Sequence, residues 1–230
     1  MVLPPLAGLV ADGVHLSYGR TVALAGANAT ISPGETVALV GPSGSGKSSL
    51  LYCLAGLIVP DRGSIRFGDL DLTRLTDDQR SDVRRSRFGF VFQFAELVPE
   101  LTLRENIMLP MELNGIGRRE RQSRASGLIE RLDLVEHADR RPSRVSGGQA
   151  QRAAVARAVV HRPAVVFADE PTGSLDSANG EVVLELLLKL AKEDGSSVIL
   201  VTHDERVAAR AGRTIRMLDG QCEEVAQCSG

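Results

Sequence analysis

Residues 41–48 read Gly41-Pro42-Ser43-Gly44-Ser45-Gly46-Lys47-Ser48 and fit the phosphate-loop pattern G-x-x-x-x-G-K-[ST] at every fixed position. An apolar run precedes this loop at residues 36–40 and a helix-like segment follows at residues 49–52, as the pattern requires. In such a loop the backbone N–H groups turn inward around a polyphosphate, and the helix N-terminus adds partial positive charge. The pattern predicts that Lys47 reaches the terminal phosphates and that Ser48 holds Mg²⁺. A glycine turn without a ligand is the alternative, which so complete a match disfavours.

A second glycine-rich element lies at residues 145–149 and precedes an alanine-rich run of high helix propensity. Ser146, with Gln149 three residues later, is also an ordinary capping box. Capping does not explain the pair Gly147 and Gly148, because glycine destabilises the start of a helix. Glycine is favoured there only where the backbone must come close to another group, such as a ligand. The pair therefore favours a second anion-binding helix terminus.

With both elements, the chain resembles the ATP-binding subunits of ABC transporters along nearly its whole length. Residues 145–149 resemble the signature motif of that family, with valine in place of the more usual leucine. The resemblance implies the cofactors ATP and Mg²⁺ and a head-to-tail dimer with a second ATP-binding subunit. In that dimer Ser146, Gly147 and Gly148 of one subunit would cover the γ-phosphate held by the loop of the other. The sequence itself shows two phosphate cradles.

Two acids follow a short apolar run at residues 165–168. The run, bounded by Pro163, predicts a buried parallel strand whose carboxyl end carries Asp169 and Glu170. Open α/β sheets bind their ligands at that end of the strands. We expect Asp169 to orient Mg²⁺ through its water shell and Glu170 to polarise the water that attacks the γ-phosphate. Either acid alone would more often be a solvated turn residue.

Four further features take their roles from the resemblance. Gln93, at the end of a predicted strand, is implied to touch Mg²⁺ or the attacking water, and His203 to contact the γ-phosphate. Residues 174–176 resemble the loop across the dimer interface, and Tyr18 resembles the aromatic residue that stacks on adenine. In isolation these residues have ordinary alternatives: a polar strand terminus for Gln93, a structural histidine for His203 and a half-exposed strand residue for Tyr18.

The predicted site therefore consists of three overlapping sets of residues. The catalytic set is Glu170, His203, Lys47 and Gln93. The nucleotide-binding set is Tyr18, Gly41, Pro42, Ser43, Gly44, Ser45, Gly46, Lys47, Ser48, Ser49, Ser146, Gly147, Gly148, Gln149 and Asp176. The metal-binding set is Ser48, Gln93 and Asp169.

Composition excludes several classes of protein. The 230 residues are 43% hydrophobic and 3% aromatic, with a formal net charge of -2. The net charge therefore gives no overall attraction to nucleic acid, and few aromatic side chains are available to stack on bases. No apolar stretch approaches the ~18 residues of a membrane span, and the N-terminus has no signal-peptide pattern. We expect a cytoplasmic chain, and the resemblance implies peripheral binding to the cytoplasmic face of the plasma (inner) membrane.

The three cysteines, Cys53, Cys222 and Cys228, are odd in number and have no C-x-x-C spacing. This arrangement indicates neither a disulfide framework nor a zinc site. Cys53 lies in an apolar run and is predicted to be a core residue.

We predict one α/β domain over residues 1–230, a P-loop NTPase of ABC type. Its mixed central sheet would be joined by an antiparallel β subdomain and an inserted helical subdomain. Residues 1–94 and 156–230 would form the ATP-binding core with the β subdomain, and residues 95–155 the helical subdomain with the signature motif. A capping box at Thr76 predicts a charged helix. Periodicity predicts further helices at residues 103–113 and 118–132, with no strand between residues 97 and 144. Apolar residues between 182 and 190 mark another amphipathic helix beyond Gly180, which is predicted to end near Gly195.

Three segments narrow the resemblance to the ATPases of lipoprotein-release, macrolide-export and antimicrobial-peptide-resistance transporters: residues 68–72, 91–107 and 171–176. ATPases of amino-acid importers and of cell division have related segments. The narrower resemblance implies a transmembrane permease subunit with four spans and a large extracytoplasmic domain, driven by mechanical transmission. The groove for its coupling helix is predicted to be lined by Phe94, Leu97, Val98, Leu101 and Met108.

Two other classes of protein share part of this pattern. A soluble ABC ATPase of translation or DNA repair would share the catalytic motifs, but usually carries a second cassette, long coiled-coil arms or zinc cysteines. A phosphate-loop kinase of small molecules would share the first loop and have no use for residues 145–149. The sequence leaves open the transported substrate, the direction of transport, the identity of the permease, and whether the ATPase dimer is a homodimer.

Overall fold

The computed structural model describes residues 7–225. Its strands are β1 (Leu9–Tyr18), β2 (Thr21–Ile31), β3 (Thr36–Val40), β4 (Arg62–Phe67), β5 (Leu70–Asp71), β6 (Phe88–Phe92), β7 (Val165–Asp169), β8 (Ser197–Val201), β9 (Arg213–Leu218) and β10 (Gln221–Val225). Its α-helices are α1 (Lys47–Leu54), α2 (Asp77–Arg87), α3 (Leu103–Leu113), α4 (Arg118–Arg131), α5 (Gly147–Val159), α6 (Ser177–Asp194) and α7 (Glu205–Ala208). Short 3₁₀ helices are η1 (Leu72–Arg74), η2 (Val135–His137) and η3 (Pro142–Arg144).

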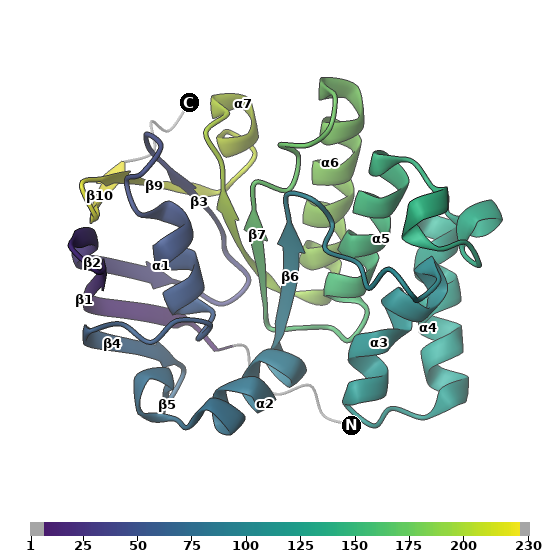
Figure 1. The fold of residues 1–230 in the computed structure, drawn as a ribbon, viewed down its shortest axis with the longest axis horizontal. Helices are drawn as coiled ribbons and strands as arrows, with labels where there is room; N and C mark the ends of the chain where they lie inside the picture. Colours follow the sequence, from purple (N-terminus) through teal and green to yellow (C-terminus); the bar gives the residue numbers. More distant parts are fainter. Residues whose placement is uncertain (1–6, 226–230) are drawn as a thin grey trace.

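Two β-sheets form the frame of the molecule. The smaller sheet is antiparallel, with the strand order β2-β1-β4-β5, and the larger has the order β10-β9-β3-β8-β7-β6. Among the described strands of the larger sheet, β9 to β6 pair in parallel and β10 is antiparallel to β9. A mixed central sheet with a separate antiparallel sheet confirms the predicted fold class (Figure 1).

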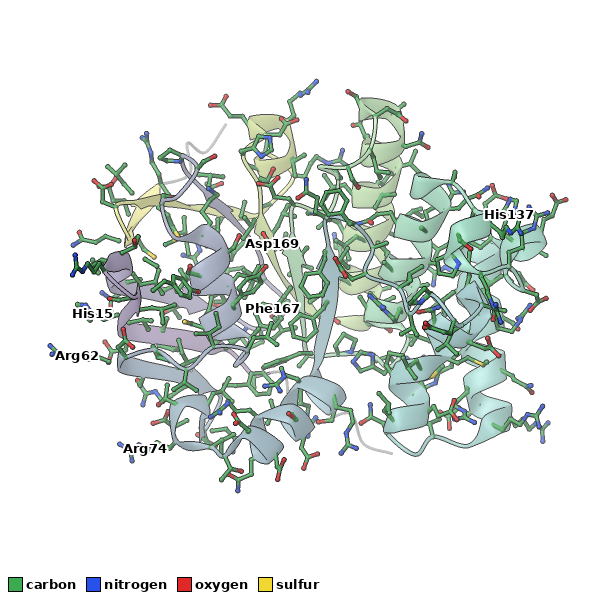
Figure 2. All side chains as sticks on the ribbon, viewed as in Figure 1. His15, Arg62, Arg74, His137, Phe167 and Asp169 are labelled. Carbon is green, nitrogen blue, oxygen red and sulfur yellow. The ribbon has the colours of Figure 1, made fainter. Side chains whose placement is uncertain are left out.

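Both faces of the larger sheet are covered, as the side chains of β7 show. Val165 and Phe167 belong to a core cluster with α1 and the smaller sheet, whereas Val166 and Ala168 belong to a second cluster with α5 and α6. Because side chains alternate across a strand, one continuous apolar run serves two cores. Figure 2 places Phe167 and Asp169 along this strand, near the centre of the molecule.

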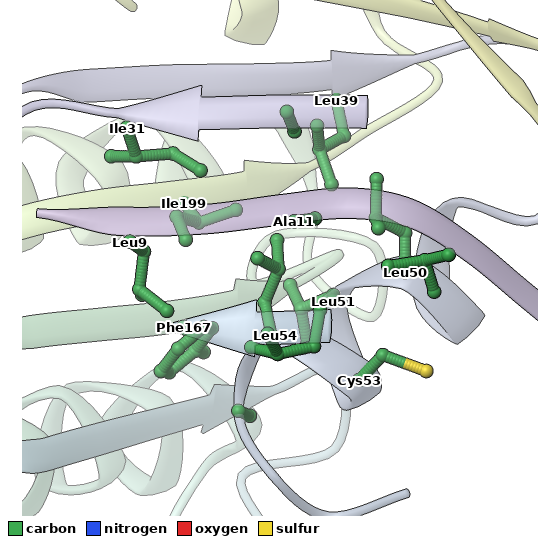
Figure 3. Packing of buried hydrophobic residues seen from close by; sticks show 14 of the residues in the cluster. Leu9, Ala11, Ile31, Leu39, Leu50, Leu51, Cys53, Leu54, Phe167 and Ile199 are labelled. Atoms are coloured by element: carbon green, nitrogen blue, oxygen red, sulfur yellow. The ribbon is translucent and has the colours of Figure 1, made fainter. Parts of the chain in front are cut away.

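The helix that follows the phosphate loop is anchored in the first cluster. Leu50, Leu51 and Leu54 of α1 are fully buried and pack in one cluster with Phe167 and Ile199 (Figure 3). Burying each leucine contributes roughly 1.5–3 kcal/mol. This packing fixes α1 against the sheet, and with it the start of the helix, where the predicted site lies.

Between β6 and β7 the chain forms helices and turns and no strand, as predicted for residues 97–144. α3 has the predicted bounds, and α4 ends at Arg131 with Leu132 as its C-cap. The capping box at Thr76 forms as predicted, and a second one at Thr102, which the sequence analysis missed, begins α3. Gly195 ends α6 in the left-handed conformation.

The cysteines agree with the prediction where they are described. Cys53 is 1% exposed in the first core cluster, and burial raises the pKa of its thiol to about 12. Cys222 is half-buried in β10, and Cys228 lies outside the described residues. Within residues 7–225, no helix combines the length and the apolarity needed to span a bilayer.

Candidate active site

The phosphate loop is shaped by glycines at positions that accept no side chain. Gly46 is the N-cap of α1 with a φ of 99°, and a Cβ there would lie 2.4 Å from the carbonyl oxygen of Ala23. At Gly41 a Cβ would lie 2.2 Å from the carbonyl oxygen of Met217. No side chain caps α1. Its first backbone N–H groups are therefore available to a ligand.

Two polar side chains are buried within this loop. Lys47 is 8% exposed, and its Nζ donates hydrogen bonds to the carbonyl oxygens of Gly41 at 3.0 Å and Pro42 at 2.8 Å. The hydroxyl of Ser45 is buried and has no hydrogen-bond partner among the described residues. A buried hydroxyl of this kind and an ammonium held inside the loop are groups that a phosphate would satisfy.

Asp169 ends β7 beside α1 and accepts two hydrogen bonds. Ser48 Oγ donates to Oδ1 at 3.0 Å, and the Tyr52 hydroxyl donates to Oδ2 at 2.7 Å. Burial, followed by the hydrogen bond to Asp169, raises the pKa of Tyr52 to about 12. Tyr52 was not among the residues predicted for the site. Its position one helical turn after Ser48 is the signal that could have found it.

Glu170 follows β7 in the left-handed backbone conformation, with a φ of 48°. Its N–H donates to the carbonyl oxygen of Val201 at 3.0 Å, which holds the turn against β8. His203, just after β8, has Nδ1 3.1 Å from Oε1 of Glu170. Backbone strain of this kind is a feature of functional sites. Two parallel strands thus bring together an acid and a histidine that are distant in the sequence.

The loop that carries Gln93 is fastened to α5 through its backbone. Gln151 of α5 is 1% exposed, and its Nε2 donates to the carbonyl oxygens of Phe92 at 2.7 Å and Pro171 at 2.8 Å. One buried amide therefore joins the end of β6 to the turn after β7. No local sequence signal indicates this role of Gln151, because its two partners lie far from it in the chain.

Arg157 holds the same loop from further along α5. Its guanidinium donates to the carbonyl oxygens of Ala95 at 2.9 Å and Glu96 at 2.6 Å. Both residues are left-handed, with φ values of 62° and 46°. On the other side, the hydroxyl of Ser174 donates to the carbonyl oxygen of Gln93. The backbone around Gln93 is therefore tied to α5 and to the segment after β7.

Several of these side chains surround one cavity of about 330 Å³. A Cβ at Gly173 would lie 2.9 Å from Gln93 Nε2 and 3.2 Å from Glu170 Oε2, so the amide and the carboxylate approach one point. The cavity is lined by Ser48, Tyr52, Phe92, Gln93, Phe94, Glu96, Asp169 and Glu170.

The donor set suits one kind of metal ion. Residues 7–225 contain no group of three or more His, Cys, Asp or Glu side chains that could hold a metal ion. Mg²⁺ needs no such group, because it takes one or two protein oxygens together with phosphates and waters. Ser48 Oγ and the Asp169 carboxylate, 3.0 Å apart, fit that requirement.

The signature residues lie apart from this cavity. Ser146 begins α5 with a complete capping box, in which its Oγ accepts from the N–H of Gln149 and its own N–H donates to Gln149 Oε1. The capping box is therefore present, while Gly147 remains exposed and anion binding at this helix start stays a prediction. The amide of Gln149 also contacts His137 at 2.8 Å, on the right of Figure 2. Figure 1 shows α5 and α1 on opposite sides of β6 and β7.

A family profile described as ABC transporter matches residues 15–173, which include both glycine-rich elements and the two acids. The chain belongs to the ABC transporter family. Within that family it is an ATPase subunit. The alternative of a small-molecule kinase is therefore wrong.

Its relatives in this family include separate ATPases and fused proteins. The lipoprotein-releasing system ATP-binding protein LolD of Legionella pneumophila is 40% identical over 90% of this chain and 91% of its own length. The macrolide export ATP-binding/permease protein MacB of Syntrophobacter fumaroxidans is 46% identical over 87% of this chain but only 28% of its own length. A dimeric structure of the ATP-binding cassette MJ0796 bound to ADP and Pi has a TM-score of 0.87 and 38% identity, covering 96% of this chain and 99% of that one.

Several predicted residues of the ABC site lie outside the cavity. Tyr18, at the end of β1, is 51% exposed. Asp176 is the N-cap of α6, and the hydrogen bond that it accepts from the N–H of Asn179, 3.0 Å away, lowers its pKa. The structure thus brings the phosphate loop, Gln93, Asp169, Glu170 and His203 together. It leaves Tyr18, Asp176 and residues 146–149 at the periphery.

An apolar groove of about 520 Å³ lies beside the Gln93 loop of this ABC subunit. Its apolar walls come from β6 and α3, and Arg84 and Arg85 of α2 contribute to its lining. The apolar side chains are chiefly Phe90, Phe92, Leu109, Pro110 and Leu113.

None of the residues predicted to line the groove for a coupling helix lines this apolar groove. Leu97 and Met108 pack against the second core cluster instead. The side chain of Asn106, fully buried, bonds the backbone of Val98 and Leu101 and folds that segment onto α3. Phe94 is exposed, as expected, but lines the cavity at Gln93.

Proposed function

We propose that this ABC ATPase pairs head-to-tail with a second ATP-binding subunit around two Mg-ATP and drives conformational change in transmembrane subunits. The observation that carries the proposal is the separation of the two glycine-rich termini, since α1 and α5 lie on opposite sides of β6 and β7. A ligand held by the phosphate loop of one subunit can contact an exposed signature motif if that motif comes from a second subunit. The dimeric cassettes of MJ0796 support this arrangement.

In the proposed site, Lys47 exchanges its carbonyl partners for phosphate oxygens, and the start of α1 adds partial positive charge. Ser48, Gln93 and Asp169 would hold Mg²⁺, which when bound neutralises charge on the phosphates. Glu170 polarises the attacking water. Phosphoryl transfer needs little covalent help from the protein, so positioning and charge neutralisation supply most of the rate.

The periphery of the site completes the proposal. His203, hydrogen-bonded to Glu170, contacts the γ-phosphate, and Tyr18 stacks on adenine. Asp176 lies across the dimer interface. Residues 41–49 surround the phosphates of one nucleotide, and residues 146–149 of the partner subunit cover the γ-phosphate.

We propose one nucleotide-binding domain over residues 1–230, with residues 95–155 as its helical subdomain. Residues 1–94 and 156–230 then form the ATP-binding core and the β subdomain. α5 crosses the boundary, and Gln151 and Arg157 hold the Gln93 loop from either side of it. A movement of the helical subdomain would therefore be transmitted to Gln93.

The proposed partner is a permease of the four-span type with a large extracytoplasmic domain, at the cytoplasmic face of the plasma membrane. The names of LolD and MacB support export or mechanical transmission. The apolar groove beside Gln93 offers a site for a short helix of that partner. Recovery of the full chain with the membrane fraction would support this partner, and recovery only from the soluble fraction would favour the soluble ABC ATPase.

The shared site is tested by mixing two inactive variants. Lys47→Ala removes the phosphate-binding ammonium, and Ser146→Arg blocks the exposed start of α5. Each variant alone should fail to hydrolyse ATP. A mixed dimer contains one site with an intact Lys47 from one chain and an intact Ser146 from the other. ATP hydrolysis and ATP-dependent dimerisation should therefore return on mixing.

The control is Ser143→Arg, which adds the same charge at another exposed serine close to α5. It should hydrolyse ATP as the unmodified chain does. Hydrolysis by Ser146→Arg alone, or no recovery of dimer and activity on mixing, would reject the shared site.

A further inference from the structure

The hydroxyl of Tyr52 has no role in the site described so far, yet it binds one of the predicted metal ligands directly. Tyr52 lies on α1, four positions after Ser48, and residues at this spacing project from the same face of a helix. That face of α1 lies against the carboxyl end of β7, where Asp169 is located. The hydroxyl donates to Oδ2 of Asp169 at 2.7 Å.

One helix therefore holds both oxygens of the Asp169 carboxylate. Ser48 binds Oδ1 at 3.0 Å and Tyr52 binds Oδ2. A carboxylate with a single partner can turn about its terminal bond, whereas a second donor on the other oxygen fixes its plane. A hydrogen bond from a hydroxyl to an ionised carboxylate is also stronger than a neutral one.

We propose that Tyr52 is a positioning residue for the divalent cation that accompanies ATP. By binding Oδ2, its hydroxyl keeps Oδ1 of Asp169 directed towards Ser48 Oγ. Asp169 Oδ1 and Ser48 Oγ are then both available to the cation. The inference rests on the proposed function, since it needs a nucleotide site. Tyr52 acts through Asp169. Loss of a group that orients a metal ligand typically lowers metal affinity by about 10–100-fold.

A packing role for Tyr52 is the competing explanation, and it predicts a different result. The ring packs against the first core cluster and lines the cavity with Gln93 and Glu170. Those contacts depend on the ring, and the bond to Asp169 depends on the hydroxyl. Tyr52→Phe keeps the first and removes the second.

The test measures equilibrium binding of a fluorescent, slowly hydrolysed ATP analogue to the full chain and to Tyr52→Phe. Binding is measured over a series of Mg²⁺ concentrations and again in EDTA. We expect the half-saturating Mg²⁺ concentration to rise about tenfold in the variant, in line with the effect of other groups that orient metal ligands. Affinity in EDTA should stay within about twofold, because the phosphate loop is intact.

Two controls make the outcome decisive. Ser86→Ala removes an exposed hydroxyl from α2, remote from the cavity, and should leave the Mg²⁺ dependence unchanged. The thermal midpoint of each variant is compared with that of the unmodified chain, to establish that both are folded. The same Mg²⁺ dependence in Tyr52→Phe and the unmodified chain, or an equal loss with Mg²⁺ and in EDTA, would overturn the inference. An unmodified chain that binds no analogue at any Mg²⁺ concentration would overturn the proposed function as well.

Discussion

The helices that follow the two glycine-rich elements, α1 and α5, begin in opposite ways. α1 starts from the left-handed Gly46 with no side-chain cap, so its backbone N–H groups face a loop built to wrap a ligand. α5 starts from Ser146, whose capping box satisfies part of the helix end internally, while Gly147 stays exposed. In the proposed function, the first terminus holds a phosphate by itself. The second terminus then covers a phosphate that the other subunit already holds.

The largest expected effect comes from Gly46→Val. Its Cβ would lie 2.4 Å from the Ala23 carbonyl oxygen at a φ of 99°, so the loop cannot keep its shape. ATP affinity of the single chain should fall by at least about 100-fold, roughly 2.7 kcal/mol. Equilibrium binding of a labelled ATP analogue measures this. Gly147→Val, at the second terminus, should instead abolish hydrolysis and spare binding to the single chain.

Gly127→Ala on α4 is the control for these glycine variants, because a Cβ there meets nothing within 4 Å. It should bind and hydrolyse ATP normally. If Gly147→Val lost single-chain affinity as strongly as Gly46→Val, the contrast between the two termini would be refuted.

The next largest effect concerns Gln151, a buried residue of α5 that lies after the exposed start of the helix. Gln151→Leu leaves two carbonyl oxygens without their donor at a position that is 1% exposed. The free energy of unfolding should fall by about 2–3 kcal/mol, and ATP hydrolysis should fall because Gln93 is no longer held. Urea unfolding and steady-state hydrolysis measure the two effects. The control is Gln122→Leu on the exposed face of α4, expected within about 0.5 kcal/mol of the unmodified chain. Equal stability of the two variants would contradict the role of Gln151.

The last residues of α5 are buried, whereas its first residue, Gly147, is exposed. His161, two residues after the end of α5, allows a test by pH. Burial lowers the pKa of His161 to about 4, while Nε2 donates to the carbonyl oxygen of Phe88 at 3.0 Å. Because the folded pKa lies below the unfolded one, the unfolded chain binds the proton first. Stability is therefore complete above about pH 6.5 and falls as the pH drops towards 4.

Between pH 7 and pH 5, His161 should account for a loss of about 1–2 kcal/mol in the free energy of unfolding. His161→Gln should remove that part of the pH dependence and leave the contribution of the carboxylates unchanged. Urea unfolding at both pH values gives the comparison. An identical loss in the variant would show that His161 is not buried in its neutral form.

The smallest effect tests the capping box itself. Ser146→Ala should lower stability by about 1 kcal/mol, the usual cost of a lost N-cap. For a chain of this size that corresponds to a thermal midpoint lower by roughly 2–4 °C. Thr102→Ala, at the equivalent box of α3, should cost a similar amount. An unchanged midpoint in Ser146→Ala would mean that the start of α5 gains nothing from its cap.

Local sequence signals predicted most of the fold. The capping box at Thr76, the glycine at position 195 and the apolar run at residues 165–168 each act within a few residues, and the corresponding helices and strand formed. The lengths of β1 and β2 were not predicted. Register shifts within β1 let the two strands pair across positions where the alternation of apolar and polar residues is interrupted.

The interactions that hold the Gln93 loop could not be predicted in this way. Gln151 and Arg157 looked like ordinary helix residues, and their partners in the Gln93 loop lie some 60 residues earlier in the chain. The packing of residues 98–101 was missed for the same reason, since Asn106 draws them against α3. Tyr52 and Asp169 are also joined only by the folding of α1 onto β7. The periodicity of a sequence describes one helix or strand at a time, whereas each of these contacts joins two elements of the fold.

The two hydrogen bonds from Lys47 to its own loop have a consequence for how tightly nucleotide is held. The ammonium already donates hydrogen bonds to the Gly41 and Pro42 carbonyl oxygens. A polyphosphate that binds there would therefore replace existing hydrogen-bond partners. The measured affinity is then a difference between two sets of contacts of similar kind. Selectivity for a triphosphate over inorganic phosphate would come less from this one charge than from the number of backbone N–H groups that the longer anion can reach at once.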